Sequence, residues 1–292
     1  MKKKKGFTLV ELLVVISIIA MLLAVLMPAL GKAKLQASAI ICTTDVRSLS
    51  LAWFLYIGDN NGKIVGAHTY LAGTETLAGQ RYASSCDKTA VYSDVKANML
   101  TNWVEMPQME NGLTQKSYPK KEYEILGIQR GLLFPYVGKK LEVFHCPNDK
   151  RLIENKKAGY GGYRSYSIAG CMDGYYDSIG TKVIKKHSQI RQPGSKYVFV
   201  EEKWTGSPGY NLDAWQLNPT GDSWTDPVSV AHGDKSILGF ADGHGEAIKW
   251  KDKRTILFSK DRETNVGNGT VSATQPDNPD LKYMQERWAT VK

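Results

Sequence analysis

The sequence predicts an α+β fold in which one long N-terminal helix packs against an antiparallel β-sheet head with irregular insertions. Three observations support this prediction. Residues 7–30 form an apolar run in which only Glu11 is charged. Residues 31–55 carry apolar side chains at the three- and four-residue spacing of a single helix face. Residues 63–292 contain short β-favourable runs that are separated by turn residues.

The composition is that of a globular protein with one exceptional end. Hydrophobic residues make up 42% and charged residues 23% of the 292 residues, which argues against wholesale disorder. The formal net charge is +9, but part of it comes from the lysines of the leader, residues 1–6. The remaining charge forms no basic stripe interleaved with aromatic residues. A collagen, a coiled-coil rod, a polytopic transporter and a nucleic-acid-binding module are therefore excluded.

The apolar run is long enough to span a membrane. At about 1.5 Å per residue it extends roughly 36 Å, against a hydrocarbon core of about 30 Å. A cleaved secretory signal has a shorter apolar core, with small residues at the cleavage site behind it. A plain membrane anchor fits the length but has no use for the carboxylate of Glu11. The lysines of the leader predict a cytoplasmic N-terminus, so the rest of the chain faces outward.

The beginning of the run carries a processing signal. A glycine at position 6, the aromatic Phe7 and Glu11 precede an unbroken apolar tail. This hexapeptide, Gly6–Glu11, resembles the cleavage and methylation signal of type IV prepilins and of the pseudopilins of type II secretion. The resemblance implies that a prepilin peptidase cleaves between Gly6 and Phe7 and methylates the new amino group, which leaves N-methylphenylalanine at the mature N-terminus.

The same resemblance implies a pilin-like domain organisation and a cellular location. Its parts are a leader at 1–6, a transmembrane and assembly helix at 7–30, an amphipathic continuation with a turn at 31–62, and a globular head at 63–292. The protein is expected to cross the inner membrane once, with a periplasmic head, and then to enter a periplasmic or extracellular filament, or fimbrium. Its implied partners are the peptidase, other pilin or pseudopilin subunits, and an inner-membrane assembly platform with a separate ATPase.

Glu11 and Pro28 are the two unusual residues of the apolar run. A carboxylate inside a membrane helix costs about 2.5–3.5 kcal/mol on insertion scales. We therefore expect Glu11 to pair with the α-amino group of Phe7 on a neighbouring subunit, which offsets this cost and fixes the axial register. The alternative is a carboxylate that snorkels to the membrane interface. Pro28 removes a backbone hydrogen bond and clashes with the preceding turn, so we expect a kink there.

The amphipathic continuation needs a cover, because its apolar face would otherwise be exposed to water. That face consists of Leu35, Ala39, Cys42, Val46, Leu49, Trp53 and Tyr56. The helix is expected to end at Gly58–Gly62, a cluster of turn-forming residues. This cluster lacks the alternating ligands and the distal glutamate of a calcium loop, so a turn is predicted there and not a calcium site.

The head is predicted to contain short strands and few helices. The runs expected to form strands are residues 63–66, 163–168, 197–201 and, as a three-stranded meander, 228–250. The segments expected to form short helices or turns are residues 95–103, 131–137 and 277–289. Residues 66–125 show no sustained periodicity, so they are expected to be mostly irregular.

Motifs in the head resemble those of one large group of pilin-like proteins, which carry a C-terminal processing-associated motif. These are Leu133–Tyr136, Cys146–Asp149, and His232 followed after nine residues by Asp242 and Gly243. The resemblance gives an architecture and a pathway but no ligand, because the group has no well-defined molecular activity.

The segment around this last motif has two readings. His232, Asp234, Asp242 and His244 offer donors for a metal or ligand site. In the structural reading, Asp242 caps a tight turn, Gly243 supplies a positive φ, and His232 hydrogen-bonds the neighbouring backbone. We favour the structural reading because alternating strand faces separate the side chains. No metal and no cofactor are therefore expected.

Four cysteines in an exported head indicate an oxidising compartment and allow three pairings. Cys42 lies on the predicted helix and Cys146 in the Cys-Pro-Asn-Asp motif, both in contexts that the resemblance covers. We expect a Cys42–Cys146 disulfide that fastens the head to the helix, which leaves Cys86 to pair with Cys171. Zinc is the alternative, although no CxxC spacing supports it.

No enzyme motif is present in the sequence: it has no phosphate-binding loop, no GxSxG elbow and no HExxH pair. No catalytic residue is therefore expected. Trp204, Tyr210, Trp215 and Trp224 crowd a Gly/Pro-rich stretch, where they could stack on sugar rings or simply pack the head. We expect a structural subunit of a type IV pilus-like or pseudopilus filament, whose head serves adhesion, secretion or uptake. The alternative is a membrane-tethered extracytoplasmic glycan-binding protein that does not polymerise.

Overall fold

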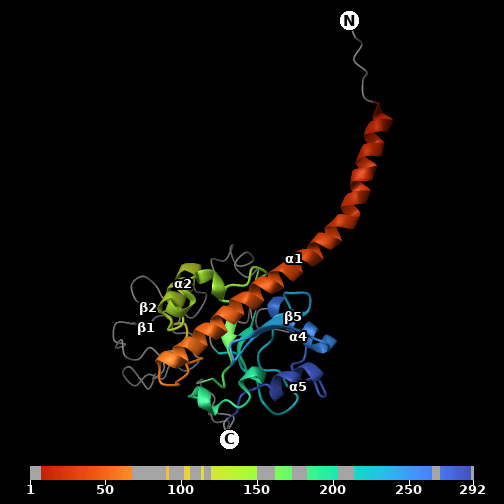
Figure 1. Ribbon diagram of the computed structural model, residues 1–292. Helices are drawn as coiled ribbons and strands as arrows, with labels where there is room; N and C mark the ends of the chain where they lie inside the picture. Colours follow the sequence, from red (N-terminus) through yellow and green to blue (C-terminus); the bar gives the residue numbers. More distant parts are fainter. Residues whose placement is uncertain are drawn as a thin grey trace.

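A computed structural model gives the fold. It describes residues 8–67, 90–91, 102–105, 113–114, 120–149, 162–172, 183–202, 214–264 and 270–290. One long helix, α1 (Leu9–Asp59), extends from a head that contains a four-stranded sheet. The N-terminal half of α1 projects away from the head and its C-terminal half lies along it (Figure 1). The expected α+β, pilin-like architecture is confirmed.

Helix α1 is a single element of 51 residues, as the apolar run and the amphipathic stripe predict. It ends at the predicted turn, where Asn61 and Gly62 have φ values of 56° and 77°, the left-handed region that small polar residues and glycine tolerate best. Most of the predicted apolar stripe is buried. The buried residues of the helix are Ser38, Ala39, Cys42, Val46, Leu49, Ser50, Ala52, Trp53 and Ile57.

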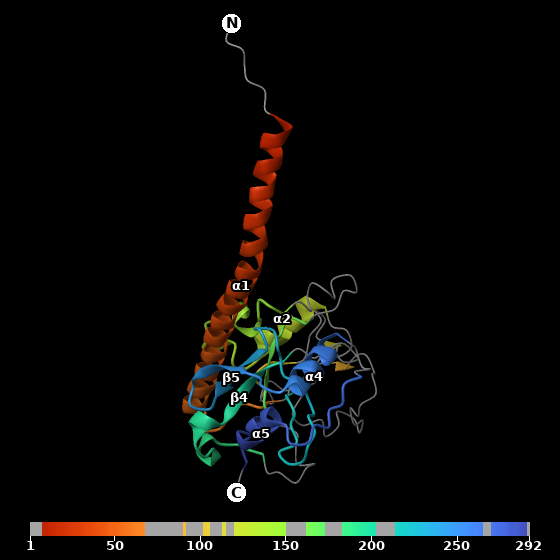
Figure 2. The same cartoon turned by 90° about the vertical axis from the view of Figure 1, so that its right-hand side faces the viewer.

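The main sheet is antiparallel throughout, with the strand order β3-β4-β5-β6. Its strands are β3 (Tyr166–Ile168), β4 (Tyr197–Glu201), β5 (Lys235–Phe240) and β6 (Gly245–Lys249). A separate pair consists of β1 (Ala90–Val91) and β2 (Leu113–Thr114). Helix α1 lies on one side of the main sheet, and α4 and α5 lie on the other (Figure 2).

Two predicted strand regions are wrong in detail. Residues 228–250 form the two-stranded hairpin β5–β6 and not a three-stranded meander, since Val228 and Val230 are buried without belonging to a strand. Residues 63–66 form only isolated bridges, from Lys63 to Lys186 and from Gly66 to Asn102. Most of the expected helix at 95–103 lies outside the described residues.

The helices of the head were only partly predicted. They are α2 (Lys121–Arg130), α4 (Lys253–Thr264) and α5 (Pro279–Glu286), with short 3₁₀ turns that include η4 (Pro135–Val137) and η5 (Leu141–Phe144). The C-terminal helix α5 is the predicted one. It begins with an Asn278 cap, whose side chain accepts bonds from the backbone of Asp280 and Leu281. Helices α2 and α4 were not predicted.

Two glycines let α1 approach the β5–β6 hairpin closely. A Cβ atom added at Gly239 would contact the Ser50 hydroxyl and would lie 2.6 Å from Val46 Cγ1. A Cβ atom added at Gly245 would lie 2.8 Å from the Thr43 carbonyl oxygen. Both separations are shorter than real Cβ contacts. The hairpin can therefore pack against α1 only because side chains are missing at these two positions.

Candidate functional site

The N-terminal half of α1 is apolar and exposed on all sides. Every residue from 8 to 37 is exposed, and the large apolar side chains of the run have exposed fractions from 44% at Leu23 to 79% at Leu9. The most apolar window of 18 residues has a mean hydropathy of 3.0, with none of it buried. By length and composition, this is a helix that could cross a membrane, as the sequence predicts.

Glu11 lies at the very start of this helix. Thr8 is the N-cap: its Oγ1 accepts a bond from the Glu11 backbone at 3.3 Å. In return, Glu11 Oε2 accepts bonds from the Thr8 backbone N–H at 2.8 Å and from the Thr8 hydroxyl at 2.7 Å. This reciprocal capping box satisfies two polar groups of the first turn. The Thr-x-x-Glu pattern of such a box is visible in the sequence at residues 8–11.

Of the other residues predicted to act in processing and assembly, the structure describes only Pro28. Gly6 and Phe7 lie outside the described residues. Pro28 lies inside α1, which continues through it as one helix. Figure 1 shows that the projecting half of the helix curves instead of running straight. A kink localised at Pro28 therefore stays a prediction.

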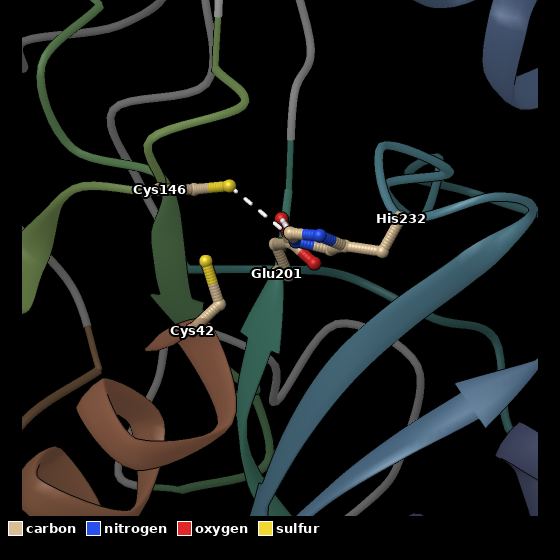
Figure 3. Close-up of side chains that lie close together, drawn as sticks. All are labelled: Cys42, Cys146, Glu201 and His232. Carbon is tan, nitrogen blue, oxygen red and sulfur yellow. Dashed lines mark hydrogen bonds and ion pairs between the residues drawn. The ribbon is translucent and has the colours of Figure 1, made fainter. Parts of the chain in front are cut away.

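Four buried side chains converge where α1 meets the head. Cys42 projects from α1, Cys146 follows η5, Glu201 ends β4, and His232 lies in the turn before β5. None of them is more than 3% exposed. One donor atom from each lies within 4.8 Å of the donor atoms of the other three. Figure 3 shows the two sulfur atoms, the imidazole and the carboxylate gathered around one point. This group is called the Cys–His–Glu cluster below.

The imidazole of His232 is at the centre of the cluster. Its Nε2 lies 3.0 Å from Glu201 Oε1 and 3.4 Å from Cys146 Sγ. Its Nδ1 lies 3.2 Å from Ser38 Oγ. The expectation that His232 hydrogen-bonds neighbouring backbone is therefore wrong, because its partners are side chains that are distant in sequence. Glu201 was not predicted as a functional residue, since its sequence context indicates only a buried strand.

The electrostatics of the cluster follow from its burial. Burial lowers the pKa of His232, but hydrogen bonds to Cys146 and Glu201 outweigh this effect and raise the pKa to about 10. The hydrogen bond to Cys42, together with burial and the nearby Glu201 carboxylate, raises the pKa of the Cys146 thiol far above its usual range. Without a bound cation, the raised pKa values therefore favour the protonated forms of the His232 imidazole and of the Cys146 thiol.

The remaining C-terminal motif residues lie elsewhere. Asp242 Oδ1 accepts a bond from the His244 backbone at 3.2 Å and lies 2.5 Å from His244 Nδ1, in the turn after β5. Gly243 has a φ of 95° in the same turn. Asp234 forms an ion pair with Lys260. The structure thus separates His232 from Asp242, at opposite ends of β5, and does not gather the four candidate donors of this segment.

The three cysteines among the described residues are thiols. Cys42, Cys146 and Cys171 are buried and free, so Cys42 and Cys146 lie close together as two thiols and not as the expected disulfide. Cys171 is buried away from the cluster, and burial raises the pKa of its thiol to about 12. Cys86 lies outside the described residues, so its pairing with Cys171 stays a prediction.

The tryptophans proposed for sugar stacking pack the head instead. Trp215 is fully buried and donates its indole N–H to the Pro227 carbonyl at 2.9 Å. Trp224 is 3% exposed and donates to Gln275 Oε1 at 3.2 Å. Neither ring presents a free face to a ligand. Trp204 and Tyr210 lie outside the described residues.

Comparisons with known proteins concern the N-terminal part of the chain. The prokaryotic N-terminal methylation motif matches residues 1–27. The type IV wide pilus major component PilA4 of Thermus thermophilus is 44% identical over 61 residues. That match covers 21% of this chain and 47% of PilA4, so the chain spans about half the length of the curated relative it matches. No solved structure matches the chain.

These similarities agree with the architecture. The relative is by its name a major component of a type IV wide pilus. The methylation motif occupies the part of the chain that forms the exposed half of α1. The N-terminal methylation motif and the 61-residue similarity to a pilus component make the N-terminal part of the chain similar to type IV pilins, and a long apolar helix docked on a four-stranded antiparallel sheet gives it a pilin-like architecture.

Proposed function

We propose that the chain is a structural subunit of a type IV pilus-like or pseudopilus filament and that it polymerises through the N-terminal half of α1. The observation that carries this proposal is the apolar surface of residues 9–30, every one of which is exposed. Apolar surface on this scale needs a partner. A bilayer supplies that partner before assembly, and the same segments of neighbouring subunits supply it afterwards.

The processing steps follow from this role. A prepilin peptidase cleaves between Gly6 and Phe7 and methylates the new amino group. The head faces the periplasm, and an inner-membrane assembly platform with a separate ATPase extracts the subunit from the membrane. The lysine-rich leader and the methylation motif at residues 1–27 support this order of events.

Glu11 sets the axial register of the filament in this proposal. Its capping bonds to Thr8 both end on Oε2, and a carboxylate can accept about four hydrogen bonds. Glu11 therefore keeps the capacity to bind a cation while it caps its own helix. After cleavage, the α-amino group of Phe7 on an adjacent subunit is a cation at the matching end of an identical helix.

The capping box makes a selective test possible. Glutamine can replace glutamate in a capping box, so Glu11→Gln keeps the helix start and removes only the charge. We expect this variant to insert into the membrane at the wild-type level and to yield far fewer sheared surface fibres by electron microscopy. Glu122→Gln, which changes an exposed glutamate in the first turn of α2, is the matched control and should assemble normally.

The outcomes separate three possibilities. Fibres whose subunits begin with methylated Phe7 by mass spectrometry support the whole proposal. Normal fibre yield from Glu11→Gln refutes the ion pair but leaves the filament. A processed wild-type protein that stays in the membrane and never forms fibres refutes polymerisation and favours a membrane-tethered binding protein.

A further inference from the structure

The Cys–His–Glu cluster has a composition that packing alone does not explain. Two thiols, an imidazole and a carboxylate meet in a site where no residue is more than 3% exposed. Charged and polar groups are costly to bury unless they are paired or bind a metal. We propose that Cys42, Cys146, Glu201 and His232 bind one Zn²⁺ ion, which fastens the head to α1.

The spacing of the donor atoms fits such a site. Zinc bonds of about 2.0–2.3 Å at tetrahedral angles place neighbouring donors about 3.3–3.8 Å apart. In the structure, His232 Nε2 lies 3.4 Å from Cys146 Sγ and 3.0 Å from Glu201 Oε1. All four donor atoms lie within 4.8 Å of one another. Shifts on the order of 1 Å or less would give tetrahedral coordination.

The chemistry of the donors selects the kind of metal. Thiolates are soft ligands that favour zinc and similar transition metals, whereas calcium and magnesium prefer sets of oxygen ligands. Four protein ligands fill a tetrahedral shell and leave no open position, which is typical of a structural zinc site. The proposed ion therefore has a structural role and adds no catalytic function.

The surrounding hydrogen bonds orient two of the ligands. The Ser38 hydroxyl donates to the Leu35 carbonyl at 2.8 Å and accepts a bond from Asn148 Nδ2, and its oxygen lies 3.2 Å from His232 Nδ1. When Nδ1 carries the proton, it can donate to this oxygen, and Nε2 is then free to bind the metal. In the same way, the Ile237 backbone donates to Glu201 Oε2 at 3.1 Å, which leaves Oε1 facing the cluster. Zinc ligands are commonly held by such outer contacts.

A metal explains more of the cluster than a disulfide does. A Cys42–Cys146 disulfide would account for the two sulfur atoms and leave a buried His232–Glu201 pair beside them. Zinc accounts for all four groups, because each offers one ligand atom and these atoms lie within 4.8 Å of one another. It also explains why two separate motifs of the head, one ending at Asp149 and one beginning at His232, come together against α1.

The test uses the full chain in detergent micelles, prepared without reductant and without added metal. We expect elemental analysis to find one zinc per chain and non-reducing peptide mapping to find no Cys42–Cys146 disulfide. After chelation, added Zn²⁺ should restore the melting temperature. Co²⁺ in its place should give the visible absorption of tetrahedral thiolate coordination, which a merely packed cluster cannot produce.

Variants assign the binding to these residues. Cys146→Ser should weaken zinc binding by more than about 100-fold, and Ser38→Ala, which keeps all four ligands, by about 10- to 100-fold. Cys171→Ser, which changes a buried thiol outside the cluster, should bind like wild type. If Cys146→Ser does not fold, Ser38→Ala decides. The proposal is overturned by a Cys42–Cys146 disulfide in the exported protein. It is also overturned if chelated, reduced wild type shows no response to Zn²⁺ or Co²⁺, or if Ser38→Ala and Cys171→Ser have equal affinities.

Discussion

Because α1 lies so close to the β5–β6 hairpin, we expect a single added methyl group at their contact to lower the stability of the fold. Gly239→Ala would place its Cβ against the Ser50 hydroxyl, 2.6 Å from Val46 Cγ1 and 3.2 Å from Phe199 Cβ. Val46 and Ser50 are themselves fully buried, so they have no open space into which to move. Overpacking of this kind costs about 1–3 kcal/mol. At about 2–4 °C per kcal/mol for a unit of 150–250 residues, the melting temperature should fall by several degrees.

A glycine-to-alanine substitution in α1 itself, at Gly58, should raise the stability of the fold instead of lowering it. Gly58 lies in the last turn of α1, with no atom within 4 Å of an added Cβ. Gly58→Ala should therefore stabilise the helix by about 0.5–1 kcal/mol. The assay is thermal unfolding of the full chain in detergent, followed by near-ultraviolet circular dichroism of the buried tryptophans. If Gly239→Ala melts at or above the wild-type temperature while Gly58→Ala behaves as expected, α1 does not pack on the hairpin at this distance.

Three further predictions concern the head and its contacts. Burial and the nearby Glu142 raise the pKa of Asp45 from 3.8 to about 6, so the folded state loses stability as pH rises from about 4 to 6. Asp45→Asn should raise the melting temperature at pH 7.5 by the equivalent of roughly 1 kcal/mol and should have little effect at pH 4; an equal effect at both pH values would contradict this. Asn278→Ala removes the cap of α5 and should lower the free energy of unfolding by about 1–2 kcal/mol in urea titrations, whereas an unchanged midpoint would refute the cap. Gly243→Val forces a β-branched residue to a φ of 95° and should cost about 1–3 kcal/mol, which a melting curve identical to wild type would disprove.

Local sequence patterns predicted the elements that carry a clear apolar pattern or a capping motif. The apolar run and the amphipathic stripe that follows it predict α1. The run is apolar on all sides and forms the exposed half, whereas the three- and four-residue spacing of the stripe marks the half that the head covers. The run Val198–Val200 predicts β4, because a central strand is buried on both faces. Asn278 and Pro279 predict the start of α5 through ordinary capping chemistry.

Helices α2 and α4 were missed because their apolar faces are weak. Helix α4 buries only a few side chains, which include Thr255, Phe258 and Ser259, between charged neighbours. Its buried Thr255 contacts the start of α5, where the Asn278 side chain donates a bond to the Thr255 hydroxyl at 2.9 Å. Tertiary contacts of this kind leave no periodic hydrophobic signal in the sequence.

The Cys–His–Glu cluster shows what the sequence could not predict. The resemblance places Cys146 beside Cys42, as an expected disulfide, but nothing in the motifs or their spacing places His232 or Glu201 beside them. Their meeting depends on the depth at which α1 docks on the sheet, and that depth depends on the bare backbones of Gly239 and Gly245. Two glycines without any chemical function of their own therefore determine whether Cys42 can reach the three donors of the head.

The place where the head docks on α1 also decides how far the head lies from the membrane segment of the proposed filament subunit. The apolar run ends near Leu30, while burial against the head begins at Ser38. The stretch between these positions corresponds to about 12 Å of helix. It includes the exposed Lys32 and Lys34, and lysines at the end of a spanning helix reach the polar membrane interface. Under the proposed function, the membrane segment and the head thus occupy separate lengths of α1, so the subunit can leave the bilayer without any change in the contacts that hold its head.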